Sequence, residues 1–141
     1  MSSKYFLLLP IFFMLLCKSS QQLNENQKSA TISLKSIYEK PNDFINQEHT
    51  LRGQFLGWSG RECRLPENAS PAITRSDWLF RDATGCIYVT GGRLSALDPF
   101  DTSNVGVDIS IRVIPRLTDE KKVYLEFVEG SIIKGVEQKI K

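Results

Sequence analysis

Hydrophobic and polar residues alternate along three segments of the chain, residues 49–58, 106–114 and 122–129. Alternation with a period of two places every second side chain on the same face of a β-strand. The first segment also carries Gly53 and Gly57, which suit a strand that bends sharply or lies close to another backbone. The pattern therefore predicts three strands, of which the first is strongly bent.

Two further strands are predicted as a hairpin in residues 78–90. The strand formers Trp78, Leu79 and Phe80 come first, and a second run of β-branched and aromatic residues covers positions 86–90. Between them, the stretch from Asp82 to Gly85 has the composition of a tight turn. With these two strands the predicted fold class is all-β, accompanied by short helices.

The segments between the strands have their own signals. Leu34, Ile37 and Tyr38 share one face of a short helix that Ser33 caps and Pro41 ends. A second short helix or single turn is predicted from Asp98 to about Asn104. Residues 59–75 form a connection longer than most in a compact domain, and such loops are often functional.

The first 17 residues have the layout of an export signal, in which Lys4 precedes an apolar run from Tyr5 to Leu16. The run is shorter than the roughly 20 residues that span a membrane. Its order of apolar core, Cys17 and polar tether resembles a bacterial lipoprotein precursor, which implies that Cys17 is lipidated and becomes the membrane-anchored N-terminus. Leu16 stands where that family has a small residue, so an ordinary signal peptide cut elsewhere and an uncleaved anchor are the alternatives. The expected location is the bacterial cell envelope, with a secreted or periplasmic protein as the alternative.

The remaining domain boundaries follow from composition. Residues 18–31 are rich in Gln, Asn and Ser and read as a flexible linker. Residues 32–133 hold all the predicted strands, and residues 134–141 form a C-terminal tail. Lys and Arg total 18 against 16 Asp and Glu, and 17 against 16 without Lys4. This near-neutral balance argues against a dedicated nucleic-acid-binding protein.

The order of helix, strand, long loop, hairpin, short helical connection and two strands resembles the OB fold, a five-stranded Greek-key barrel with a helix at one end. Local matches resemble the anticodon-binding type of that fold: Leu51-Arg52-Gly53, Leu79-Phe80-Arg81-Asp82 with Thr84-Gly85, and Ile87-Tyr88-Val89. The resemblance covers about residues 33–130. It is specific for the fold and implies no particular activity.

The resemblance also implies a ligand face on the outside of the sheet. In the nucleic-acid-binding relatives a base stacks on an aromatic residue at the position that Asp77 occupies here, where an acid repels phosphate. Trp78 and Phe80 are expected to point into the barrel. The outward set is then Arg52, Gln54, Leu79, Arg81 and Tyr88. The alternative is that these residues cover an ordinary solvated sheet face.

The long loop is the second candidate surface, because the corresponding loop borders the ligand groove in OB folds. It follows Trp58 and carries Arg61, Arg64 and Arg75. An exposed Trp beside arginines suits a sugar, an acidic peptide or another anionic partner. The alternative is that Trp58 packs beneath its own loop.

Cys63 and Cys86 pair in a disulfide if the long loop folds back along the barrel, and otherwise remain two unpaired thiols. The sequence contains neither a catalytic motif nor a metal-spaced cluster. No enzyme, metal or cofactor is therefore expected. The leading hypothesis is an exported, lipid-anchored OB-fold module that binds a protein, a glycan or a small anion. A single-strand nucleic-acid-binding protein and a structural accessory subunit are the alternatives.

Overall fold

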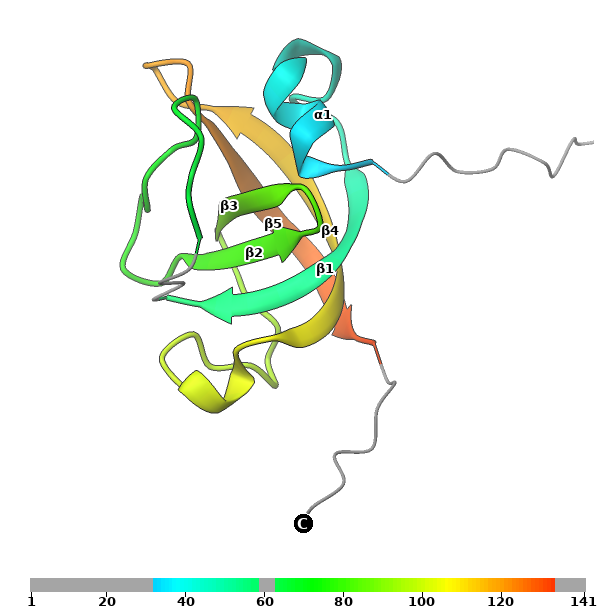
Figure 1. The fold of residues 1–141 in the computed structure, drawn as a ribbon, viewed down its shortest axis with the longest axis vertical. Helices are drawn as coiled ribbons and strands as arrows, with labels where there is room; N and C mark the ends of the chain where they lie inside the picture. The colour runs from blue at the N-terminus through cyan, green and yellow to red at the C-terminus, as the bar shows by residue number, and fades with distance from the viewer. Residues whose placement is uncertain (1–31, 59–62, 134–141) are drawn as a thin grey trace, which may run out of the picture.

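The computed structural model describes residues 32–58 and 63–133 (Figure 1). The predictions for the export signal, Cys17, the linker, Arg61 and the C-terminal tail lie outside these residues. The described elements are helix α1 (Leu34–Glu39), 3₁₀ helices η1 (Pro41–Asp43) and η2 (Thr102–Asn104), and strands β1 (His49–Gly57), β2 (Trp78–Asp82), β3 (Gly85–Thr90), β4 (Val107–Leu117) and β5 (Val123–Ile132). Across this part of the chain, no helix combines the length and apolar character needed to cross a membrane.

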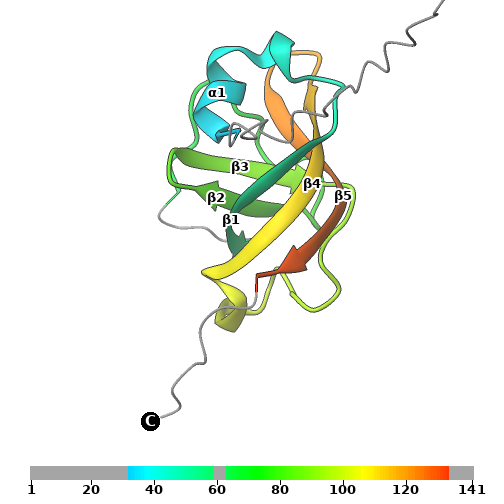
Figure 2. The same cartoon turned by 90° about the vertical axis from the view of Figure 1, so that its right-hand side faces the viewer.

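The five strands close into a barrel in the order β1-β2-β3-β5-β4, with β4 pairing back onto β1. All pairings are antiparallel except the short one between β3 and β5. The two cartoon views show the strands wrapped around one interior, with α1 at one end and η2 at the other (Figures 1 and 2). The predicted fold class, a five-stranded all-β barrel with short helices, is confirmed, and the topology is compatible with an OB-like barrel.

The barrel interior is filled by the side chains that the alternation places inward. Trp78 and Phe80 are both fully buried, as predicted. Trp78 packs against Phe55, with ring centroids 5.0 Å apart, and its indole N–H donates to the carbonyl of Gly92 at 2.9 Å. Gly53 lies where a Cβ would collide with the backbone of Arg81 and the ring of Phe80. The inference that a neighbouring backbone passes close to β1 is therefore confirmed at this glycine.

Helix α1 covers one end of the barrel and is tied to the β2–β3 hairpin. Ser33 caps the helix as predicted, and Leu34 and Ile37 are fully buried in the core. The carboxylate of Asp82 accepts hydrogen bonds from the backbone of Leu34 at 2.7 Å and from the backbone of Thr84 at 2.7 Å. One acid therefore joins the helix start to the turn, two segments far apart in the sequence.

The connection between β3 and β4 takes the shorter of its two predicted forms. Of the short helix or single turn expected from Asp98 to about Asn104, the structure has a single turn, the three-residue η2, which begins at Thr102. The Asp98 carboxylate instead accepts a hydrogen bond from the backbone N–H of Phe100 at 2.9 Å, and Asp101 caps η2. A side-chain bond of this kind favours a turn over a helix, which explains why the helical segment is shorter than its signals predict.

Candidate functional site

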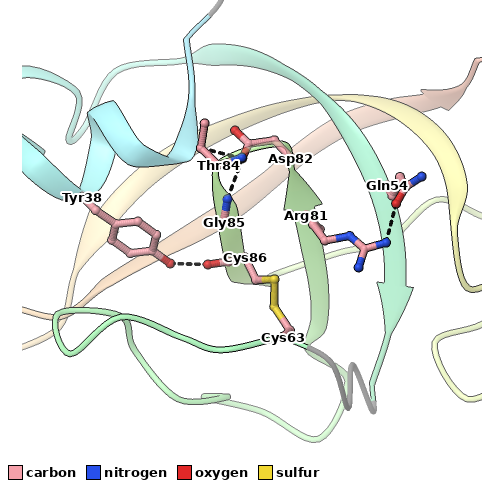
Figure 3. The surroundings of a disulfide bond; sticks show 8 residues. All are labelled: Tyr38, Gln54, Cys63, Arg81, Asp82, Thr84, Gly85 and Cys86. Atoms are coloured by element: carbon pink, nitrogen blue, oxygen red, sulfur yellow. Dashed lines mark hydrogen bonds between the residues drawn. A yellow bond between two sulfur atoms is a disulfide. The ribbon is translucent and has the colours of Figure 1, made fainter.

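The long loop folds back over the outside of the barrel, and a disulfide between Cys63 and Cys86 fastens it there (Figure 3). The two Cα atoms are 6.0 Å apart, within the range that a disulfide can bridge. Of the two alternatives that the sequence leaves open, a disulfide and two unpaired thiols, the structure has the disulfide. Beneath the loop lies a second small hydrophobic cluster formed by Leu56, Leu79 and Cys86, with Cys63, Leu65 and Tyr88 packed against it.

Beyond the disulfide, the loop pairs with the start of β5. Ala69 forms a β-bridge to Val123. The backbone N–H of Ser70 donates to the carbonyl of Val123 at 2.8 Å, and the N–H of Val123 donates to the carbonyl of Asn68 at 2.8 Å. The Asn68 side chain donates to the carbonyl of Tyr38 at 2.9 Å. The sequence Asn68-Ala69-Ser70 is therefore built into the fold, with Ala69 and Ser70 buried.

Asp77 is not on an outer ligand face, which corrects the expectation from the sequence. It is 1% exposed, and its carboxylate accepts hydrogen bonds from the backbone N–H groups of Ile73 at 2.6 Å and Thr74 at 2.9 Å. The acid holds the returning part of the loop in a tight turn just before β2. Its presence thus carries no information about phosphate binding.

Four members of the predicted ligand face come together on β1, β2 and β3. Gln54 and Arg81 are cross-strand partners, and the Arg81 guanidinium donates to the Gln54 side-chain oxygen at 2.6 Å (Figure 3). Leu79 and Tyr88 are also cross-strand partners. Leu79, however, is only 4% exposed. Its inclusion among accessible binding residues is wrong, because the loop covers it. Tyr88 is half-buried at the edge of the same cluster.

The other predicted residues lie apart from this group. Arg52 is exposed farther along β1, opposite Ser110 of β4. Arg75 is exposed on the returning part of the loop. Arg64 lines a groove of about 620 Å³ between α1, the β2–β3 turn and the loop, which also includes Lys35, Tyr38, Glu39, Leu65 and Glu67. Charges of both signs line this groove, so it favours neither an anionic nor a cationic ligand.

Tyr38 lines the groove and also contacts Cys86 of the disulfide. Its hydroxyl donates to the carbonyl of Cys86 at 2.6 Å (Figure 3). Burial, together with the negative charge of Asp82, raises the pKa of Tyr38 above its usual range. The phenol therefore stays protonated and keeps donating this hydrogen bond at neutral pH.

Trp58 lies at the end of the barrel opposite α1, and its surroundings differ from those expected. It is 49% exposed, so the described part of the loop, residues 63–75, leaves its side chain accessible. Its neighbour is the aromatic ring of Phe100, 63% exposed, with the ring centroids 6.0 Å apart. Arg64 lines the groove beside α1 instead of flanking this pair. The expectation of a Trp beside arginines is thus corrected for Arg64.

The backbone holds the two aromatic residues together. The Trp58 N–H donates to the carbonyl of Pro99 at 2.8 Å. Gly57 has a φ of 70°, and a Cβ at this position would lie 2.6 Å from the same carbonyl oxygen. Only glycine allows the β3–β4 connection to approach so closely in this conformation. Gly57 therefore brings Trp58 and Phe100 side by side.

Phe100 is not among the binding residues that the sequence predicts. It follows Asp98-Pro99, a pair that is typical of a helix start, where a single aromatic residue gives no signal of a binding site. The available signal was that Phe100 is a large aromatic residue between the acids Asp98 and Asp101, in a connection where no strand is predicted. Such a residue has no predicted core position to fill, and exposed aromatic residues are enriched at binding sites.

The structure is thus a closed five-stranded barrel compatible with the OB fold, with a disulfide-linked loop over Leu79 and Cys86 and an exposed aromatic pair at the far end. Comparison of the sequence with protein-family models and with curated proteins finds no match in either. Within residues 32–58 and 63–133, no group of three or more His, Cys, Asp or Glu side chains is placed to hold a metal ion.

Proposed function

We propose that the chain is an exported, lipid-anchored OB-fold module of the bacterial cell envelope that binds a protein and performs no catalysis. The observation that carries the proposal is the Cys63–Cys86 disulfide across the outer face of the barrel. Disulfides of this kind persist in oxidising compartments outside the cytosol. They agree with the export signal predicted for residues 1–17.

The covered sheet face is the reason for preferring a protein to an oligonucleotide. Leu79 and Cys86 are each 4% exposed, so the chain's own loop occupies the part of the outer sheet face around them, a face on which bases stack in nucleic-acid-binding OB domains. The aromatic pair at the far end, by contrast, remains accessible. Aromatic residues on an otherwise polar surface favour a protein partner.

Expression of the full-length chain in a bacterium tests this proposal. The expected product partitions into the detergent phase, lacks residues 1–16, carries acyl mass on Cys17 and has its other two cysteines oxidised. A soluble product that retains Met1 and has free thiols at Cys63 and Cys86 would contradict export, anchoring and the role given to the disulfide. A Cys17→Ser variant is the matched control, because it removes the acyl acceptor and leaves the barrel cysteines in place.

A further inference from the structure

The end of the barrel opposite α1 carries a group of exposed apolar side chains. They are Trp58 at the end of β1, Phe100 and Val105 in the β3–β4 connection, and Ile132 and Ile133 at the end of β5. Both views place η2 and the end of β5 at this end of the barrel (Figures 1 and 2). We call these five residues the distal rim. Single exposed apolar residues are common, but two large exposed aromatic residues in contact, as Trp58 and Phe100 are, form a candidate interaction surface.

The aromatic part of the distal rim is held in place before any partner binds. A hydrogen bond from the backbone N–H of Trp58 to Pro99 holds the main chain at Trp58, and Asp98 closes the turn that presents Phe100. The two rings are inclined by 35° and leave about half of each side chain or more in contact with solvent. Binding to a surface that is already ordered loses little conformational entropy, and exposed Trp residues are frequent hot spots.

Among the described residues at this end of the barrel, acids are the more numerous charged side chains. Asp98, Asp101 and Asp108 are all exposed at this end of the barrel, and Arg93 lies 3.9 Å from Asp98. Hydrogen bonds from the side chain and backbone of Ser103 lower the pKa of Asp101, so this acid is charged at neutral pH. The described residues here thus combine an aromatic centre with acidic neighbours.

From this combination we infer that the distal rim docks a basic, partly apolar segment of a partner protein, with Trp58 and Phe100 as the central contacts. Lys and Arg stack favourably on exposed aromatic rings, and complementary charge at the edge of an interface accelerates and orients association. This inference rests on the proposed binding function but not on the lipid anchor.

Two other occupants fit the rim less well. A glycan would also stack on the rings and use the carboxylates of Asp98 and Asp101 as hydrogen-bond acceptors, but a neutral glycan would leave the negative charge of these exposed acids without a counter-charge. A membrane surface would favour aromatic residues as well, but the negative surface of anionic lipids repels three exposed acids.

The test uses the full-length protein in a neutral detergent and a phage-displayed library of random peptides as the probe. Peptides selected on the protein are synthesised, and their affinity is measured by fluorescence. The chain has two Trp residues, and Trp78 is fully buried. A change in tryptophan fluorescence on peptide binding therefore reports on the exposed Trp58, and the emission of the buried Trp78 serves as an internal reference.

The expected peptides combine Lys or Arg with apolar residues. Their affinity falls about tenfold or more in Phe100→Ala and changes less than about twofold in Ile73→Ala, which removes an exposed apolar side chain from the long loop. Asp98→Asn and Asp101→Asn keep an oxygen for the local hydrogen bonds, so their combination removes two negative charges, one of them paired with Arg93, and leaves these bonds in place. It weakens binding about threefold to tenfold, whereas Asp119→Asn in the β4–β5 turn leaves binding unchanged.

Several outcomes would overturn the inference. Selected peptides that bind Phe100→Ala as tightly as the wild type would place binding elsewhere. Selected peptides that are acidic or neutral would contradict a basic partner. Peptides that bind the combined Asp98→Asn and Asp101→Asn variant as tightly as the wild type would contradict it as well. Binding of neutral chitohexaose that depends on Phe100 would assign the rim to a glycan instead. Unfolding midpoints of all variants verify that the barrel is intact. None of these results depends on the acyl mass that tests the proposed anchor.

Discussion

Breaking the bond between Cys63 and Cys86 is the perturbation whose effect the structure specifies most fully. The two residues are 23 positions apart, and the chain-entropy model assigns about 3 kcal/mol to closing a loop of this length. The large core of the barrel contains neither cysteine. Loss of the bond is thus expected to free the loop and lower stability without dissolving the barrel.

Urea unfolding of the chain from residue 18 onward, with and without reductant, measures this effect. This chain omits Cys17, so the two barrel cysteines are the only thiols. The free energy of unfolding is expected to fall by about 3 kcal/mol on reduction. With a urea m-value of about 1.5 kcal/mol/M, the midpoint falls by about 2 M. The m-value rises slightly, because the uncrosslinked unfolded chain exposes more surface.

The Cys63→Ala variant is the matched control. Its urea midpoint should resemble that of the reduced wild-type protein and should not change when reductant is added. Near-ultraviolet circular dichroism of the reduced protein should retain the signal of the packed Trp78 and Phe55. Equal midpoints for the oxidised and reduced protein would refute the reasoning that the bond constrains the unfolded chain. Complete loss of the aromatic signal would refute the separation of the barrel from the loop.

Three further predictions concern residues that join distant segments. Asp82→Ala removes the acceptor shared by Leu34 and Thr84 and should lower stability by about 2 kcal/mol in urea unfolding, whereas a wild-type midpoint would refute the tie between α1 and the hairpin. Gly57→Ala should cost more than about 1 kcal/mol because of its positive φ and the nearby Pro99 carbonyl, and an unchanged midpoint would exclude that strain. The raised pKa of Tyr38 contributes stability that is present below the unfolded-state pKa of about 10 and is lost as the pH rises above it. Tyr38→Phe should therefore flatten the decline of the free energy of unfolding between about pH 9 and 11. Equal slopes for the variant and the wild type would contradict this assignment.

Much of the barrel could be predicted because its strands obey a local rule. Residues 107–113 alternate, and the structure buries Ile109, Ile111 and Val113 as the alternation requires. The hairpin, the Ser33 cap and the inward direction of Trp78 and Phe80 also follow from signals that span only a few residues. Strand ends were less accurate, since β4 and β5 continue past their predicted limits through mutual pairing as far as Leu117 and Ile132.

The candidate surfaces could not be predicted to the same extent. Leu79 has the alternation of an outward residue, and it does point outward, but the loop that covers it comes from a segment with no periodicity. Asp77 carries no sign of burial in its own sequence. It is buried because the turn at Ile73 and Thr74 supplies donors to its carboxylate. Contacts of this kind depend on how a loop returns, which local propensity does not encode.

The sequence by itself determined the strand pattern, the helix at the start of the domain and the side of each strand that faces the core, because these depend on the period of apolar residues. Only the tertiary structure decided which outward residues remain accessible. The disulfide and the β5 pairing close the loop over Leu79, and Gly57 lets Pro99 approach so that Phe100 meets Trp58. These contacts join segments that are tens of residues apart, and their energies appear only when the barrel has brought those segments together.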